Sequence, residues 1–327
     1  MLKSSERVNS IRLTTDVLKV SEAESTRDDG PGHEATLRIS FACNQNCGFC
    51  FVDLSKTIVP LREIESSLDL MSPHARAAEY LVISGGEPTT HPDLPKILRL
   101  CRKKGFARIL IQTNGVLLSK QNAAEKLGTL TYLISFHSHR PDIYDQLTRS
   151  KRQFKPAVQG IRNILKIDAN TVILNIIINN LNYTDLPDHI DFIAGLREGR
   201  PISVFFSMLN DVGLVKTPQL AVDLRMARPF INEALKRCRK KGVNVMSFTG
   251  NCAPPVCQTD KPASYRSRSK YSQGDVQYLD DFTGADGGGR AKSLSCRNCS
   301  CDQYCRGVPV DYAKRFGVSM LRPVART

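Results

Sequence analysis

Three cysteines lie within eight positions of one short segment, FACNQNCGFCFVD at residues 41 to 53. They are Cys43, Cys47 and Cys50, and their spacing is C-x3-C-x2-C. Most tetrahedral metal sites use four protein ligands, but three thiolates can hold three irons of a [4Fe-4S] cube and leave the fourth iron open. An open metal position is typical of a catalytic site. The spacing therefore indicates a catalytic iron-sulfur loop, and structural zinc with a remote fourth ligand is the alternative.

A second motif, SGGEP at residues 84 to 88, follows the next predicted strand. Gly85 and Gly86 offer backbone that a small ligand can approach closely. The carboxylate of Glu87 is suited to hold an ammonium group. A plain strand-to-helix turn would also use these residue types. Because the two motifs follow consecutive strands, we expect one site that contains both.

Short, nearly continuous apolar runs alternate with amphipathic segments from residue 37 onward, which is typical of parallel strands and the helices that connect them. Strands are expected at 36–42, 80–84, 108–113, 132–137, 172–178 and 202–208. Helices are expected at 61–79, 93–104, 119–127, 156–167, 184–196 and 220–241. These units predict an α/β fold, either a doubly wound sheet or an open parallel barrel. A complete eight-stranded barrel would need two more units.

Active-site residues in such folds lie at the carboxyl ends of the strands. The polar side chains that follow the third to sixth predicted strands are Thr113, Asn114, Ser135, His137, Asn179, Asn210 and Asp211. The last four of these are candidates for substrate contacts or catalysis. A histidine at a strand end, such as His137 or His139, is at least as often a structural group held by hydrogen bonds.

The cysteine loop, with Phe49 before its last cysteine, and the GGEP motif that follows it resemble the two motifs of the radical SAM superfamily. The resemblance covers roughly residues 36 to 210, and the ordered pair is more specific than either motif alone. It implies a partial (β/α)6 TIM-type barrel. It also implies a [4Fe-4S] cluster whose open iron binds S-adenosylmethionine. Reductive cleavage would then give a 5'-deoxyadenosyl radical that takes a hydrogen atom from the substrate.

The resemblance also implies roles for individual residues, with Cys43, Cys47 and Cys50 as cluster ligands. The residues implied to bind S-adenosylmethionine are Phe49 near adenine, Gly85, Gly86 and Glu87 at the methionine amine, and Thr113, Asn114 and Ser135 around the methionyl and ribose groups. His137 falls where many relatives carry a small or acidic residue, so its role stays open. The glycine motif that some relatives carry on the fifth strand is not evident here.

Six further cysteines lie between residues 252 and 305. Cys296, Cys299 and Cys305 are spaced C-x2-C-x5-C, which resembles the core of the SPASM and twitch extensions of radical SAM enzymes. With Cys257 as fourth ligand they would form a closed auxiliary [4Fe-4S] site, and Cys252 or Cys301 could replace a member. A four-cysteine zinc site is the structural alternative. No cysteine follows Cys305, which favours one auxiliary cluster rather than two.

The composition of the 327 residues, 41% hydrophobic and 24% charged, is that of a soluble globular protein. No apolar run resembles a signal peptide or a membrane-spanning helix, so we expect a cytoplasmic protein without membrane contact. Eleven cysteines in a reducing cytosol indicate metal binding rather than disulfides. Cys101 and Cys238 lie in similar helical contexts and are expected to be small buried hydrophobic residues.

The amino-acid composition of the chain changes near residue 249. We expect an N-terminal extension at 1–35, a radical SAM barrel at 36–248 and a cysteine-rich auxiliary-cluster domain at 249–327. A region sparse in large apolar residues is more easily stabilised by metal than by burial. The first 35 residues are too few for an independent domain that binds a leader peptide.

A formal charge of +14 favours an acidic partner. The leading expectation is an enzyme that acts on a small molecule, such as a natural-product or cofactor precursor, or on a peptide that a separate partner delivers. Its electron donor would be of the flavodoxin or ferredoxin type. RNA modification by the same chemistry is an alternative, although aromatic platforms for stacking bases are not visible. A non-enzymatic zinc or electron-transfer protein is a further one.

Overall fold

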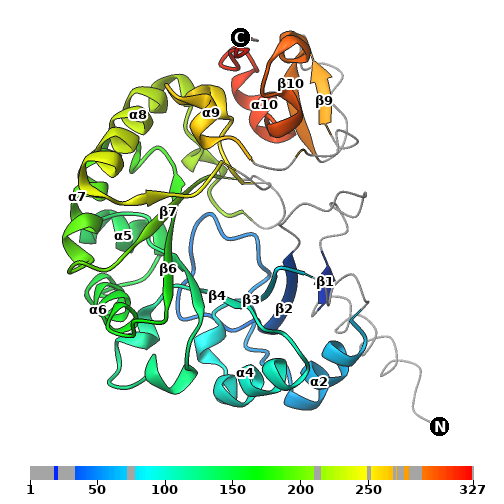
Figure 1. Cartoon of the computed structure of the whole chain (residues 1–327), viewed down its shortest axis with the longest axis vertical. Helices are drawn as coiled ribbons and strands as arrows, with labels where there is room; N and C mark the ends of the chain where they lie inside the picture. Colours follow the sequence, from blue (N-terminus) through cyan, green and yellow to red (C-terminus); the bar gives the residue numbers. More distant parts are fainter. Residues whose placement is uncertain are drawn as a thin grey trace. The chain divides into compact units, whose positions relative to one another are not determined.

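The structure is a computed structural model that describes residues 18–20, 34–71, 78–209, 215–248, 252–267, 270, 276–279 and 289–325. The chain divides into two compact units. The first unit comprises residues 1–46, 52–135 and 155–172, and the second comprises residues 47–51, 136–154 and 173–327. Both units are built from parallel strands and the helices that follow them (Figure 1).

The first unit contains five strands in the order β1-β2-β3-β4-β5. Strand β1 pairs antiparallel with β2, and β2 to β5 are parallel. The strands are β1 Leu18–Val20, β2 Glu34–Ser40, β3 Tyr80–Gly85, β4 Ile109–Thr113 and β5 Thr131–Ser135. The α-helices of this unit are α2 Leu61–Asp69, α4 Leu94–Lys103 and α6 Phe154–Leu165. The parallel order of β2, β3 and β4 brings their carboxyl ends to one edge, where the two motifs lie.

Helix α4 illustrates how the local sequence determines these elements. Pro95 lies in its first turn, where the missing N–H group has no partner to lose. Ile97, Leu98 and Cys101 recur at helical spacing and are fully buried. Arg102 and Lys103 lie in the last turn, where their positive charges interact favourably with the negative end of the helix dipole. The expected burial of Cys101 is therefore confirmed.

The second unit contains the parallel strands β6, β7 and β8 and a separate sheet in the order β11-β10-β9. The strands are β6 Thr171–Ile178, β7 Ser203–Met208, β8 Asn244–Val245, β9 Val276–Leu279, β10 Arg290–Ser293 and β11 Val308–Pro309. The α-helices are α5 Pro141–Thr148, α7 Leu186–Leu196, α8 Leu224–Lys241, α9 Pro262–Tyr265 and α10 Val310–Phe316. Within the described ranges, no helix combines the length and the apolar character needed to cross a bilayer.

One helix prediction was wrong, and one helix was missed. The segment 119–127 forms no α-helix but contributes to two short 3-10 helices, Val116–Ser119 and Glu125–Leu127. Asn122 separates them with a φ of 58°, a left-handed conformation that ends helical hydrogen bonding. Helix α5 was not predicted, although Pro141 in its first turn is a recognisable start signal.

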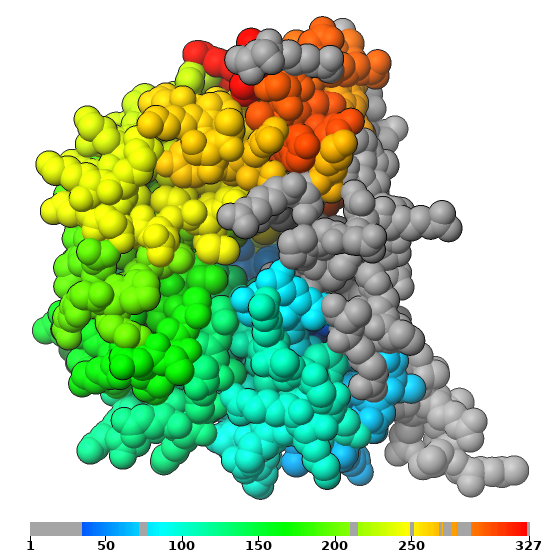
Figure 2. Space-filling view, in the orientation of Figure 1, coloured from blue at the N-terminus to red at the C-terminus, as the bar shows by residue number. Residues whose placement is uncertain are grey.

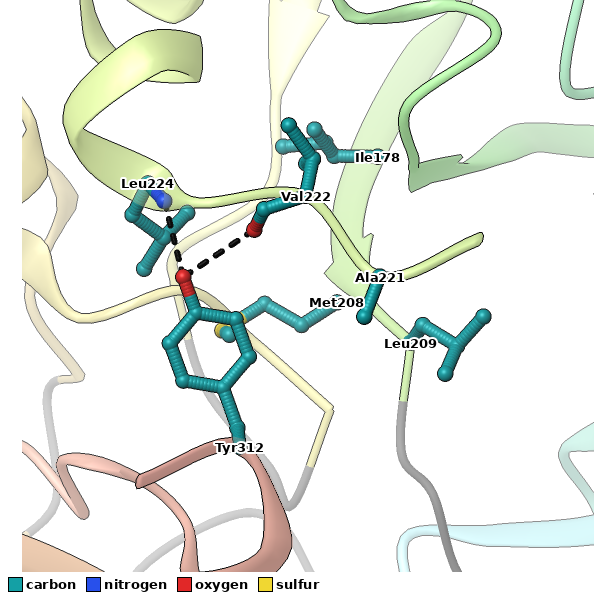
Figure 3. Close-up of a pocket in the computed structure, with 7 residues that line it drawn as sticks. All are labelled: Ile178, Met208, Leu209, Ala221, Val222, Leu224 and Tyr312. Atoms are coloured by element: carbon teal, nitrogen blue, oxygen red, sulfur yellow. Dashed lines mark hydrogen bonds between the residues drawn. The ribbon is translucent and has the colours of Figure 1, made fainter. Parts of the chain in front are cut away.

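The cysteine-rich segment after residue 289 packs against residues 252–267 of the same unit, as the orange and yellow surfaces show (Figure 2). Tyr312 of α10 extends this packing to the start of α8. Its hydroxyl donates to the Val222 carbonyl at 3.0 Å and accepts from the Leu224 N–H at 2.7 Å (Figure 3). Its ring lines a small, largely apolar hollow together with Met208 and Leu209. Small-molecule sites are far larger, roughly 300 Å³ or more, so this hollow is a packing seam.

Candidate active site

In the second unit, residues 47–51 carry the last two cysteines of the loop. The Cys50 N–H donates to the Cys47 carbonyl at 3.2 Å and closes a tight turn. Gly48 lies inside this turn, and its carbonyl accepts from the N–H groups of Lys216 and Thr217 at 2.9 and 3.0 Å. A Cβ at Gly48 would lie 2.3 Å from Thr217 Oγ1. A larger residue at position 48 would therefore need the Thr217 side chain to move, a constraint that the sequence did not reveal.

Phe49 packs edge-on against His137, with ring centroids 4.8 Å apart. The same ring contacts an apolar cluster that includes Leu147, Leu209 and Leu220. The Ile177 N–H donates to Nδ1 of His137 at 3.2 Å, so the ring accepts at this nitrogen. Burial lowers the pKa of His137 to about 4, which a hydrogen bond with the Asn175 backbone offsets only in part. His137 is thus a neutral ring that supports Phe49 at physiological pH.

In the first unit, the two glycines of the GGE motif pack against the end of β2. A Cβ at Gly85 would lie 2.0 Å from the Ser40 carbonyl oxygen, and one at Gly86 would lie 2.4 Å from that of Ala42. Gly86 and Glu87 also donate their N–H groups to these two carbonyls, at 2.6 and 2.8 Å. The glycines therefore let two segments of the chain's own backbone approach each other.

Glu87 is 1% exposed, and its carboxylate accepts four hydrogen bonds. Oε1 accepts from the N–H and hydroxyl of Thr89 at 3.0 and 2.6 Å, and from the Thr113 hydroxyl at 2.7 Å. Oε2 accepts from the Asn114 N–H at 2.7 Å. Burial raises the pKa of Glu87, while these donors oppose the rise. Oε2 accepts fewer bonds than Oε1, so it is the oxygen better placed to accept from an ammonium group.

Asn114 connects the end of β4 to the beginning of the cysteine loop. Its Nδ2 donates to Asn44 Oδ1 at 2.8 Å, and its Oδ1 accepts from the Val116 N–H at 3.0 Å. Cys43 precedes Asn44, and its thiol accepts from the Gln45 N–H at 3.4 Å. The sequence did not single out Asn44, although a polar side chain next to Cys43 was the available signal. Ser135 ends β5 and is partly buried.

Asn179 is fully buried, and its side chain is used by its own turn. Oδ1 accepts from the Leu181 N–H and Nδ2 donates to the Ile177 carbonyl, both at 2.9 Å. These local bonds are those of an Asx turn. The other two candidates at strand ends, Asn210 and Asp211, lie outside the described residues.

Five of the six C-terminal cysteines influence one another's ionisation, which places their thiols close together. The pKa of Cys257 is raised to about 12, mainly by burial. The nearby thiols of Cys305 and, less strongly, Cys296 add to this rise. The pKa of Cys296 is raised to about 11, again mainly by burial. The thiols of Cys305 and, less strongly, Cys299 add to this rise. Cys301 lies in the same group, because Cys299 and Cys305 add to the effect of burial in raising its pKa.

Cys252 has different surroundings, because burial raises its pKa and the Arg290 guanidinium lowers it. Arg290 itself donates to the carbonyls of Ala253 and Gly307 at 3.2 and 2.6 Å. Cys299 accepts N–H hydrogen bonds at its sulfur from Cys301 at 3.4 Å and from Val324 at 3.2 Å. Across the described ranges, no three His, Cys, Asp or Glu side chains form a group that would hold a single metal ion.

A buried ion pair holds the cysteine segment to its sheet. Lys292 of β10 is 1% exposed, and its Nζ contacts Asp302 Oδ1 at 2.8 Å and the Asp302 carbonyl at 2.7 Å. The Tyr278 hydroxyl donates to the same carboxylate at 2.8 and 3.0 Å. The positive charge of Lys292 also opposes the rise in the pKa of Cys296.

A family model described as the Radical SAM superfamily matches residues 37–193 of the chain, which include the cysteine loop and the GGE motif. This part of the chain is a radical SAM domain. Cys43, Cys47, Cys50 and Glu87 all fall inside the matched range.

The chain is similar to two curated proteins. One is a 7,8-dihydro-6-hydroxymethylpterin dimethyltransferase of Methanocaldococcus jannaschii, 27% identical over 158 residues, or 44% of this chain and 31% of the relative. The other is an Fe-coproporphyrin III synthase of Methanosarcina barkeri, 27% identical over 229 residues, or 65% of this chain and 54% of the relative. The chain thus matches about half, or less, of the length of these relatives.

Among solved structures, Streptococcus suis SuiB bound to S-adenosylmethionine has a TM-score of 0.58 at 16% identity, covering 85% of this chain and 73% of SuiB. A second structure, of SuiB bound to the precursor peptide SuiA, has a TM-score of 0.54 at 18% identity, covering 75% and 54%. At these identities the likeness concerns the fold. The α/β prediction is confirmed: this is the partial TIM-type barrel of radical SAM enzymes with a cysteine-rich C-terminal region.

Membership of the radical SAM superfamily implies a [4Fe-4S] cluster and S-adenosylmethionine as cofactors. The residues present fit this pair. None of the eleven cysteines forms a disulfide, and the three loop thiols are partly buried. Glu87 is a buried carboxylate that offers Oε2 as an acceptor.

Proposed function

We propose that this chain cleaves S-adenosylmethionine reductively and uses the 5'-deoxyadenosyl radical to take a hydrogen atom from a small-molecule substrate. The observation that carries this proposal is the buried carboxylate Glu87, hydrogen-bonded at the end of β3. Strand β3 pairs with β2, the strand that leads into the loop of Cys43, Cys47 and Cys50. A [4Fe-4S] cluster bound by the three thiolates would supply the electron for this cleavage.

The chain's own residues bind and orient the cofactor. Glu87 Oε2 would accept from the amino group of S-adenosylmethionine, and the donors from Thr113 and Asn114 keep that carboxylate in one orientation. Phe49, supported by the neutral ring of His137, would hold the loop backbone beside the adenine. Preorganised polar groups of this kind cost little reorganisation when the reaction begins.

The test is to reconstitute the full chain with iron and sulfide without oxygen, reduce it with dithionite and measure 5'-deoxyadenosine by mass spectrometry. We expect S-adenosylmethionine cleavage by the wild type and its loss in Cys47→Ala. Cys238→Ala is the matched control, because Cys238 is fully buried in α8, away from both cysteine clusters in the sequence. A wild type that binds iron but forms no 5'-deoxyadenosine would refute the proposal.

The proposed substrate class is a small molecule. The names of the two curated relatives refer to a pterin and a coproporphyrin, both small heterocycles. A peptide is the second candidate, favoured by the structure of SuiB with its precursor peptide. Incubating the enzyme with fractions of a deuterated host extract and following deuterium into 5'-deoxyadenosine distinguishes the two, because peptides and small molecules separate by size. Transfer from the peptide fraction alone would overturn the small-molecule proposal.

We also propose that Cys257, Cys296, Cys299 and Cys305 bind a second [4Fe-4S] cluster, with Cys301 or Cys252 as possible replacements and zinc as the alternative metal. The support is the mutual electrostatic influence of these thiols. Iron and sulfide analysis of the wild type should give about eight irons per chain, and about four in Cys257→Ser. Bound zinc in anaerobically purified protein would contradict the proposal.

The electron donor is proposed to be a flavodoxin or ferredoxin, because the chain carries a charge of +14 and such donors are acidic. The proposed compartment is the cytoplasm, since thiolates that ligate clusters must stay reduced. The division into an extension at 1–35, a barrel at 36–248 and an auxiliary domain at 249–327 remains our proposal for the domain organisation.

A further inference from the structure

A row of polar side chains crosses strands β2, β3 and β4 in the first unit. Arg38 of β2 lies beside Ser84 of β3 in the parallel register. The Ser84 hydroxyl donates to Gln112 Oε1 of β4 at 2.7 Å, which continues the row. Because side chains alternate between the two faces of a strand, all three lie on one face of the sheet. Figure 1 shows the three strands side by side.

Arg38 has an unusual setting for a charged residue. It lies in the interior of β2, between Leu37 and Ile39, which are both 0% exposed and face the opposite side. Arg38 itself is partly buried. Among the residues that the structure describes, it forms no ion pair and no side-chain hydrogen bond. A guanidinium that has lost part of its hydration without gaining a partner destabilises the fold, so a functional reason for it is expected.

Gln112 offers further hydrogen-bond donors on the same face of the sheet as Arg38. Its Oε1 is occupied by the Ser84 hydroxyl, so the side chain turns its Nε2 donors away from Ser84. The row therefore presents the planar donors of Arg38 and the amide N–H groups of Gln112, while Ser84 fixes the orientation of the amide. A guanidinium binds carboxylate and phosphate oxygens in a bidentate manner, and an amide donor adds specificity.

The row lies next to the proposed cofactor site within the same unit. Arg38 precedes Ser40 by two residues, which is about 7 Å along a strand, and the pairing of β2 with β3 shifts register between them. The Ser40 carbonyl accepts the Gly86 N–H of the GGE motif. A substrate anchored at Arg38 would therefore extend toward the strand ends at which the radical forms.

We propose that Arg38 and Gln112, positioned by Ser84, bind an anionic group of the substrate, either a carboxylate or a phosphate. The substrate class is then an anionic small molecule rather than a neutral one. This inference rests on the proposed function for the identity of the ligand as substrate, but the anion site itself can be measured without turnover.

The test is isothermal titration calorimetry of the full-length, iron-loaded protein with succinate and, separately, with inorganic phosphate. Each titration is done with and without S-adenosylmethionine. We expect saturable binding of at least one anion to the wild type. Arg38→Gln should weaken it about tenfold or more, and Gln112→Leu by a smaller factor, because the charged donor contributes more than the amide. Arg38→Lys should retain part of the binding, since it keeps the charge but loses the fork.

Arg99→Gln is the matched control, because Arg99 is an exposed arginine of α4 in the same unit. It should bind the anions as the wild type does. Binding of succinate alone indicates a carboxylate substrate, and binding of phosphate alone indicates a phosphorylated one. No binding to the wild type, or equal binding to Arg38→Gln, would overturn the inference. Anion binding by a chain that forms no 5'-deoxyadenosine would leave the site intact and refute only the proposed function.

Folding of the variants is checked by their melting temperatures. Because Arg38 has no partner in the described structure, Arg38→Met should melt no lower than the wild type while losing anion binding. A loss of binding together with a large loss of stability in Arg38→Met would show a structural role and count against the inference.

Discussion

At the scale of single residues, burial decides what the polar side chains of the site can do. Glu87 and His137 both lie at strand ends, and both are nearly inaccessible to solvent. Glu87 is held as an acceptor by donors from two strand ends, whereas His137 is held neutral and accepts from the Ile177 N–H. The carboxylate of Glu87 can therefore accept a hydrogen bond from a cofactor's ammonium group. The neutral, buried imidazole of His137 instead packs against its neighbours.

Replacing Glu87 with glutamine tests this carboxylate. The new amide would direct N–H groups at donors that need an acceptor, so we expect the free energy of unfolding to fall by about 1–3 kcal/mol. Binding of S-adenosylmethionine, measured by equilibrium dialysis, should weaken by about tenfold through loss of the charge. Glu125→Gln, at an exposed position, should change neither quantity. Unaltered cofactor affinity in Glu87→Gln would contradict the assigned role.

His137 makes the stability depend on pH. Its folded pKa of about 4 lies below the unfolded value near 6.5, so its contribution to stability is present above pH 6.5 and is lost as the pH falls toward 4. The loss due to His137 should amount to about 2 kcal/mol at pH 5. His137→Asn, which keeps an acceptor for Ile177, should therefore show a smaller loss between pH 7 and pH 5 in chemical denaturation. Equal losses would show that His137 is not buried in the neutral form.

At the scale of elements, glycines determine how closely the strand ends approach each other. Gly85 and Gly86 lie against the carbonyls of Ser40 and Ala42, and Gly48 lies against Thr217. In each case backbone or side-chain atoms occupy the space that a Cβ would need. The glycines of the motif are thus first a requirement of the fold, and only through it a requirement of the ligand site.

Gly86→Ala and Gly195→Ala should have opposite effects on stability. A Cβ at Gly86 would meet the Ala42 carbonyl, so we expect a loss of about 3 kcal/mol or more together with loss of cofactor binding. Gly195 lies inside α7 with no atom near its would-be Cβ, so alanine there should stabilise the protein by about 1 kcal/mol. Chemical denaturation measures both changes, and a neutral Gly86→Ala would show that the backbone can yield at this point.

At the scale of the whole molecule, contacts between residues far apart in sequence stabilise the second unit. The Tyr312 hydroxyl bonds Leu224 and Val222, 88 and 90 residues earlier in the chain (Figure 3). These bonds satisfy a donor and an acceptor at the start of α8 and tie α10 of the cysteine-rich segment to it. The segment is therefore held by packing as well as by any metal it binds.

Tyr312→Phe measures this connection. The Leu224 N–H would be left buried without its acceptor, so the free energy of unfolding should fall by about 1–3 kcal/mol. Limited proteolysis should then cut near α10 more readily in the metal-free protein. Tyr183→Phe, at a partly exposed tyrosine, should leave the cleavage rate unchanged. Equal cleavage in the two variants would show that the hydroxyl does not stabilise the junction.

The sequence by itself indicated the family, the alternation of strands with helices and the residue types of the site. It could do so because Cys43, Cys47, Cys50 and the GGE motif are local patterns, and because alternation of apolar runs with amphipathic segments reports parallel strands directly. It misplaced a helix at 119–127, where Asn122 adopts the left-handed conformation that asparagine tolerates better than most residue types.

Only the tertiary structure decided how the polar residues are used. It showed that Asn179 serves its own turn, that Asn44 bonds Asn114, and that His137 supports Phe49. It also placed Arg38 beside Ser84 without a carboxylate partner in the described residues. Hydrogen bonds and burial depend on which distant segments meet, and a linear pattern does not contain that information.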